Sequence, residues 1–214
     1  MSVTTFAELK TSIAAWLNRS GATSFTDRAG DFVTFCEADF NSKLRVRAME
    51  QYSNSAMTTA TGVTTAALPT GWLQGRSVWL AGTTPKQILR YYTPDQLHTV
   101  YVQNSSGQPK VFSIVGDNAE FGPTPDAAYD VAALFYKKLD ALSDTTTSNW
   151  MLANHPDVYL YGSLKHAMPF LRHDQRMPVW ESLYERALER VQRADDRDRH
   201  SGGTLTMQTD TGAP

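Results

Sequence analysis

Apolar residues spaced three and four positions apart predict a helix near the start of the chain. Thr5 can cap its first turn, because Glu8 follows three residues later. The stripe consists of Phe6, Leu9, Ile13, Trp16 and Leu17. A second, longer helix is predicted from residues 26–28 through Leu44, about 20 residues or roughly 30 Å at the usual rise.

Two further long helices are predicted in the C-terminal part of the chain. One begins at Pro156, a residue favoured in the first turn, and buries one side for about 16 residues. The last begins near residues 175–178, and its apolar stripe ends at Val191. Because residues 190–199 lose that stripe, we expect them either to project from the helical body or to fray.

Between these helices the pattern is typical of strands and turns. Val111–Val115 is rich in β-branched residues, and Gly116-Asp117-Asn118 can turn the chain back into an antiparallel hairpin. Residues 129–136 are almost continuously apolar, which predicts a third strand of the same small sheet, covered on both faces. We expect five or six short strands here and one small helix at residues 93–97.

The order of these elements predicts an α+β fold that is mainly a helical bundle with a central β-rich insertion. Four principal helices come from the N- and C-terminal halves. We expect a single domain over residues 1–198, with helical halves 1–55 and 138–198 around a β-insert at 56–137. Residues 199–214 are polar and glycine-rich and are predicted to form a flexible C-terminal tail.

Composition narrows the function classes. The formal net charge of −2 favours neither nucleic acid nor an anionic membrane as a partner. Cys36 is the single cysteine, so the chain has no internal disulfide, and its apolar neighbours predict a packing role. No signal peptide and no spanning segment is visible, and we expect a soluble protein.

The sequence predicts no catalytic residue, cofactor site or metal site. The closest helical pair of histidines, His155 and His166, is about three turns apart, too far to share a metal ion. The aspartates lie in turns without the spacing of a calcium loop. Phosphate-binding loops and nucleophile motifs are also absent, so we expect the protein not to be an enzyme.

Several aromatic residues of the β-rich region permit two interpretations. They could stack single-stranded bases, or they could pack within a small sheet, and the lack of interleaved basic residues favours packing. The residues concerned are Trp72, Trp79, Tyr91, Tyr92 and Tyr101.

Four segments resemble the head-to-tail adaptor proteins of tailed bacteriophages. They are residues 92–97 (YTPDQL), 109–117 (PKVFSIVGD), 121–125 (FGPTP) and 149–162 (NWMLANHPDVYLYG). The resemblance covers nearly the whole chain and implies a relation to head completion proteins and to tail tubular or gatekeeper-type connectors. It implies a helical bundle with a β-rich insertion and no active site.

The resemblance also implies a structural role in the virion, at the head-to-tail junction. Such adaptors, made in the host cytoplasm, assemble as a ring, usually of twelve copies, under the portal protein. The ring docks tail or nozzle proteins and continues the channel through which DNA passes without sequence-specific binding. No membrane is involved. Each subunit needs two lateral faces, an upper face for the portal and a lower face for the tail.

We expect the charged end of the last helix and the tail to bind the portal, because a disordered extension can order on binding. The candidate portal-binding residues are Arg190, Arg193, Arg197, Arg199, Leu205 and Met207. The candidates for contacts with neighbouring subunits or tail proteins are Trp79, Tyr91 and Tyr92.

The alternatives are a nucleic-acid-binding module, another non-catalytic phage assembly module and a small-ligand enzyme. A nucleic-acid-binding module requires a basic face and salt-sensitive binding. An enzyme requires a pocket with convergent titratable groups.

Overall fold

The protein folds into two compact units. The computed structural model describes residues 3–20, 23–101, 105–171 and 177–199. Residues 1–47 and 141–214 form one unit, called here the helical unit, and residues 48–140 form the other, called the β unit. The expected single adaptor domain stays a prediction, and residues 200–214 of the expected tail lie outside the described residues.

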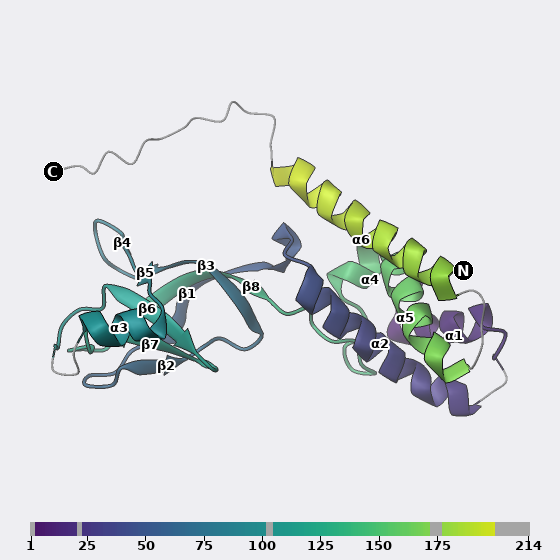
Figure 1. Ribbon diagram of the computed structural model, residues 1–214, viewed down its shortest axis with the longest axis horizontal. Helices are drawn as coiled ribbons and strands as arrows, with labels where there is room; N and C mark the ends of the chain where they lie inside the picture. Colours follow the sequence, from purple (N-terminus) through teal and green to yellow (C-terminus); the bar gives the residue numbers. More distant parts are fainter. Residues whose placement is uncertain (1–2, 21–22, 102–104, 172–176, 200–214) are drawn as a thin grey trace. The chain divides into compact units, whose positions relative to one another are not determined.

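The α-helices of the helical unit are labelled in Figure 1. They are α1 (Phe6–Trp16), α2 (Thr23–Lys43), α4 (Trp150–Asn154), α5 (Pro156–Leu171) and α6 (Met177–Arg199). A 3₁₀ helix, η1 (Arg47–Met49), follows α2. Thr5 and Glu8 form the predicted capping box of α1. The four long helices are therefore confirmed as elements.

Helix α5 packs against both α2 and α6, and side chains of both helices approach its backbone closely at Gly162. A Cβ atom at this position would overlap the sulfur of Cys36 and lie 2.9 Å from Cε2 of Tyr184. Cys36 and Tyr184 are both fully buried. Glycine is therefore required here so that a side chain from α2 and one from α6 can pack directly on the backbone of α5.

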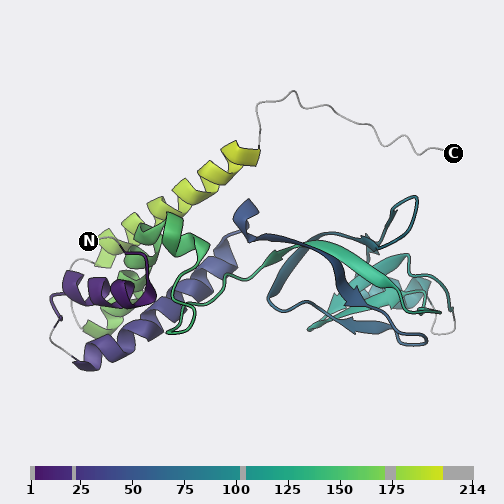
Figure 2. The same cartoon turned by 180° about the vertical axis from the view of Figure 1, so that it is seen from behind.

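Helix α6 continues to Arg199, and its last turns extend past α5 (Figures 1 and 2). Its apolar stripe ends at Val191, as the sequence predicts. Of the two expectations for residues 190–199, fraying is wrong, because the helix is continuous to Arg199.

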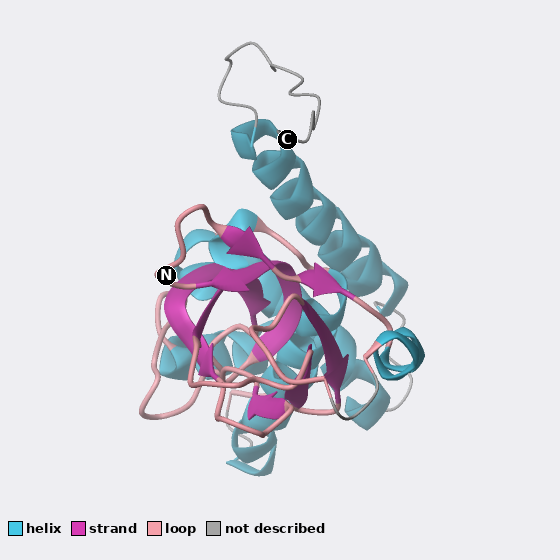
Figure 3. Ribbon diagram, turned by 90° about the vertical axis from the view of Figure 1, so that its left-hand side faces the viewer, coloured by secondary structure: helices cyan, strands magenta, loops and turns pink. Residues whose placement is uncertain are grey.

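The described residues of the β unit form eight strands and one α-helix. They are β1 (Glu50–Thr58), β2 (Thr65–Ala67), β3 (Trp72–Leu80), β4 (Gln87–Ile88), β5 (Arg90–Tyr91), α3 (Pro94–Val100), β6 (Val111–Val115), β7 (Asn118–Gly122) and β8 (Asp130–Lys137). One sheet has the order β1-β8-β3-β4 and the other β2-β7-β6-β5. Figure 3 shows these strands grouped around a common interior.

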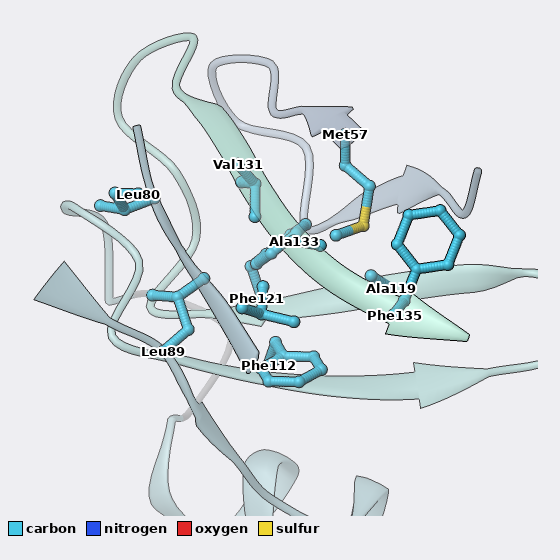
Figure 4. Packing of buried hydrophobic residues seen from close by; sticks show 10 residues of the cluster. Met57, Leu80, Leu89, Phe112, Ala119, Phe121, Val131, Ala133 and Phe135 are labelled. Atoms are coloured by element: carbon cyan, nitrogen blue, oxygen red, sulfur yellow. The ribbon is translucent and has the colours of Figure 1, made fainter. Parts of the chain in front are cut away.

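Side chains from both sheets fill that interior (Figure 4). Phe112 and Phe121 come from the β6–β7 hairpin, and Val131 and Phe135 come from β8. All four are at least 94% buried, and burying a phenylalanine side chain contributes about 1.5–3 kcal/mol. The β unit thus has an apolar core of its own.

The predicted fold class, a mainly helical bundle with a central β-rich insertion, is wrong. The described chain is α+β with six α-helices and two four-stranded sheets around a separate core. The number of strands was underestimated because β1 carries few buried residues and does not alternate cleanly. Its pairing with β8 defines it, and this pairing joins residues far apart in the sequence.

The predicted hairpin is confirmed, but the assignment of the third strand is wrong. Strands β6 and β7 pair antiparallel, and Gly116 has a positive φ of 59° in the turn. Strand β8 is buried as expected, but it lies in the other sheet, between β1 and β3. Pro123 and Pro125 in the connection remove ladder donors, so the chain leaves the hairpin sheet before β8 begins.

We expect the Gly162→Ala variant to be destabilised by about 1–3 kcal/mol, because the new methyl group must displace Cys36 or Tyr184. Denaturant unfolding of the purified protein measures this change. Gly30→Ala in α2 is the matched control, since the nearest atom to its Cβ would be 3.7 Å away. An alanine there is expected to be neutral or stabilising. Equal stability of the two variants would contradict the packing described for Gly162.

Candidate partner-binding surfaces

The base of α6 is fixed by polar contacts to α2. The hydroxyl of Tyr184 donates to the Asp39 carboxylate at 2.7 Å, and Lys43 pairs with Glu185 at 3.0 Å. Burial raises the pKa of Tyr184, so this hydroxyl stays a donor at any physiological pH. These contacts, together with the packing at Gly162, set the direction in which α6 leaves the helical core.

The charged end of α6 is ordered by an anchor at Asp195. One carboxylate oxygen of Asp195 accepts from the backbone N–H of Arg47 at 2.7 Å, and the other accepts from Nε of Arg199 at 2.7 Å. Arg47 also donates to the backbone oxygen of Asp198 at 2.9 Å. Hydrogen bonds to charged groups contribute about 1.5–3 kcal/mol. They therefore hold the last turns in helical form where apolar contacts are lacking.

The four arginines predicted to bind the portal lie along these turns, but three of them have partners within the protein. Arg190 pairs with Asp157, Arg193 with Glu189 at 2.6 Å, and Arg199 with Asp195 at 2.7 Å. Arg197 is exposed and has no ion pair within the described ranges. The net positive potential of this surface is thus smaller than the sequence suggests. The other two candidates, Leu205 and Met207, lie outside the described residues.

The connection that returns the chain to the helical unit is held by a buried carboxylate. Glu37 is 5% exposed and accepts hydrogen bonds from the backbone N–H of Leu142 at 2.8 Å and the hydroxyl of Tyr159 at 3.0 Å. Asn149 in turn donates to the same hydroxyl at 2.6 Å. Burial raises the pKa of Glu37, which these two hydrogen bonds only partly offset. This group links α2, α5 and the connection at residues 141–149.

The three aromatic candidates of the β unit differ in accessibility. Trp79 is half-buried, with Tyr52 stacked on it at 5.7 Å and Nζ of Lys86 3.4 Å from its ring centroid. Tyr92 is also half-buried. Tyr91 is 56% exposed and touches Phe112 edge to face at 5.5 Å. Packing therefore accounts for much of Trp79, whereas most of Tyr91 is available to a partner.

A pocket of about 890 Å³ lies along the first part of β3, and we call it the β3 pocket. Every residue from 68 to 78 lines it, and the opposite wall includes Ile88, Tyr91 and Ile114. The charged side chains at the pocket are those of Arg76, Asp117 and Lys138. This pocket was not predicted from the sequence, because its shape depends on where the two sheets separate. The apolar residues Leu68-Pro69 and Trp72-Leu73 beside the turn at Gly71 were the available signal.

Three observations describe the chemistry available in the described ranges. The described ranges contain no group of three or more His, Cys, Asp and Glu residues placed to hold a metal ion. Among the helices in those ranges, none is long and apolar enough to cross a membrane. Burial raises the pKa of the Cys36 thiol well above its usual value, which makes this side chain a poor nucleophile.

We expect Asp195→Ala to loosen the end of α6 without unfolding the protein. Loss of the anchor should cost about 1–2 kcal/mol locally and speed amide exchange over residues 190–199 roughly five- to thirtyfold. Asp196→Ala is the matched control, because Asp196 is exposed and makes no hydrogen bond or ion pair with the described residues. Equal exchange rates in the two variants would show that Asp195 does not anchor the helix.

We expect the stability advantage of the wild-type protein over the Glu37→Gln variant to be larger at acidic pH. The folded pKa of Glu37 is raised above the unfolded value near 4.5, so the stability that its protonated form contributes is full below that value. It is lost as the pH rises through the folded pKa. The difference in unfolding free energy, wild type minus variant, should therefore grow between pH 7 and pH 4.

Glu8→Gln provides a control of opposite sign for this pH series. Backbone hydrogen bonding from Thr4 lowers the pKa of Glu8, so the stability it contributes is lost as the pH falls. The advantage of wild type over Glu8→Gln should shrink on acidification. The same pH trend for both variants would contradict the assignment of Glu37 as a desolvated carboxyl group.

Comparison with known proteins gives a family for the whole chain. The model of the family described as SU10 adaptor protein matches residues 4–208. Comparison with curated proteins finds no match. The resemblance to bacteriophage adaptors is thus confirmed at the level of the family. The chain belongs to the SU10 adaptor protein family.

Proposed function

We propose that the protein is a structural component of a bacteriophage virion, the head-to-tail adaptor. It assembles as a ring, with twelve copies expected, under the portal at the head-to-tail junction. There it docks tail or nozzle proteins and continues the DNA channel. The observation that carries this proposal is the adaptor-family match over residues 4–208. The exposed end of α6 and the exposed Tyr91 of the β unit support it, since both are accessible to other proteins.

The charged end of α6 is the proposed portal face. Asp195 keeps this end helical, so it presents its charges on a rigid element. Pre-ordering lowers the entropy lost on binding. Because Arg190, Arg193 and Arg199 are already paired, their guanidinium groups contribute chiefly by exchanging partners with portal carboxylates. Arg197 is the arginine of this set that can bind a portal carboxylate without breaking an ion pair of the described chain.

The β unit provides the proposed contacts to neighbouring subunits or tail proteins. Tyr91 is the strongest of the three candidates, because it is 56% exposed and lines the β3 pocket. Exposed tyrosines supply large contact area and a hydroxyl donor, and they are enriched at interfaces. Trp79 and Tyr92 are half-buried and contribute through their exposed edges.

This function involves no turnover of substrate, and DNA passes through the ring without sequence-specific contacts. The net charge is −2, and ion pairs within the protein partly neutralise Arg190, Arg193 and Arg199 of α6, which reduces the positive charge that α6 offers to phosphate groups. These observations favour the adaptor over a nucleic-acid-binding module.

Co-sedimentation with purified portal rings tests the portal face. We expect Arg197→Glu to weaken binding roughly tenfold, or about 1.4 kcal/mol, because it places a negative charge opposite portal carboxylates. Asp196→Arg, the neighbouring exposed position, should leave binding unchanged or strengthen it. The adaptor proposal is contradicted if the wild-type protein does not sediment with portal rings. Equal binding by the wild type and Arg197→Glu would instead move the portal face away from α6.

A further inference from the structure

The first part of β3 has an open edge. Strand β8 pairs with one side of β3, but β4 pairs only with Trp79 and Leu80 on the other side. Residues 72–77 therefore have no strand partner on that side within the described chain. An unpaired edge presents backbone N–H and C=O groups to which an extended segment can bind.

The β3 pocket lies at this open edge, so an added strand would also find apolar side-chain contacts. Leu73 and Ile114 line its walls, and two large exposed residues stand at one end, Ile88 at 59% and Tyr91 at 56%. Exposed apolar residues gathered at a hollow mark a binding site more often than scattered ones do. The site thus combines backbone partners with room for two or three apolar side chains.

The C-terminal part of the chain contains a segment that fits this site. Residues 204–209 read Thr-Leu-Thr-Met-Gln-Thr, with Leu205 and Met207 two positions apart and no charged residue. This alternation places both apolar side chains on one face of an extended strand, and threonine favours that conformation. The segment also has six residues, as does the open edge of β3.

We propose that residues 204–209 of one copy bind as an antiparallel strand along residues 72–77 of a second copy, with Leu205 and Met207 in the β3 pocket. Main-chain hydrogen bonds then supply affinity, and the two apolar side chains supply specificity. The inference rests on the proposed association of copies in a ring and does not require the portal. It gives Leu205 and Met207 a binding place different from the predicted portal contact.

Charge favours the antiparallel direction. In that direction Asp210, which follows the segment, reaches the start of β3, where the backbone N–H of Lys138 donates to the carbonyl of Gly71 at 2.7 Å. Lys138 lines the pocket and has no ion pair within the described part of the chain. A parallel strand would place Asp210 beside Val78 at the other end, a buried apolar residue. An ion pair between Asp210 and Lys138 therefore fixes the direction.

Disulfide cross-linking between full-length copies tests the proposal. A Gln74→Cys variant, altered at an exposed position of the pocket, is mixed with a Met207→Cys variant, without portal, over a series of concentrations. Cys36 stays in both, because it is fully buried. We expect the mixed disulfide to form and its yield to rise with concentration. Asn54→Cys replaces Gln74→Cys in the control, since β1 is the opposite edge strand of the same sheet.

The expected rate with Gln74→Cys exceeds that with Asn54→Cys roughly tenfold, the equivalent of about 1.4 kcal/mol. Adding Leu205→Asp to the Met207→Cys copy should abolish this excess, whereas Thr206→Asp, on the other face of the strand, should reduce it less. Equal rates at both edges, or no effect of Leu205→Asp, would overturn the proposal. So would a disulfide that forms at a concentration-independent rate within a Gln74→Cys, Met207→Cys double variant, because the segment would then bind its own copy.

Portal docking is measured separately, so the two proposals fail independently. If the cross-link is absent while the wild-type protein still sediments with portal rings, the adaptor role stands and the strand addition does not. If cross-linking follows the expected pattern but the wild-type protein does not bind portal rings, the contact between copies is supported and the adaptor role is contradicted.

Discussion

The absence of a side chain at Gly162 determines how the helical unit is built. Cys36 from α2 and Tyr184 from α6 fill the space that a side chain would take, so the two helices pack directly on α5. The Tyr184 hydroxyl then reaches Asp39, and Lys43 reaches Glu185. Close packing and two polar contacts thus fix α6 at its base. The direction of the whole helix follows from this constraint.

Beyond Val191 a different interaction maintains the same helix. The apolar stripe of α6 ends there. The Asp195 carboxylate then stabilises the outer turns by accepting hydrogen bonds from the backbone N–H of Arg47 and from the side chain of Arg199. The outer turns are thereby ordered while most of their surface stays accessible. The β unit likewise combines a packed interior with an accessible edge. Its interior is closed by side chains of both sheets, and part of the β3 edge is left open. In each unit a packed core positions a surface that is proposed to bind partners.

Elements with a strong local pattern could be predicted from the sequence. The stripe of α1, the capping box at Thr5 and the hairpin around Gly116 depend on neighbours within a few residues. The capping box and the hairpin are confirmed, and so is the stripe except for Trp16, which is 46% exposed. The sheet to which β8 belongs could not be predicted, because its partner β1 lies far away in the sequence and is largely polar. Local propensity does not specify such pairing.

The candidate surfaces could likewise be predicted only as far as they depend on local sequence. The arginines of α6 were visible as a charged run, but their pairing with Asp157, Glu189 and Asp195 depends on the fold. The exposure of Tyr91 and the half-burial of Trp79 likewise depend on which faces the strands present. The β3 pocket had no sequence signature beyond a few apolar residues near a turn.

The central claim is that this member of the SU10 adaptor family completes the portal as a ring. Electron microscopy of portal rings incubated with the purified full-length protein tests it most directly. The account predicts an additional closed ring on one face of the portal, with the charged end of α6 at the contact. Portal rings that stay bare under conditions in which the protein remains folded would contradict it.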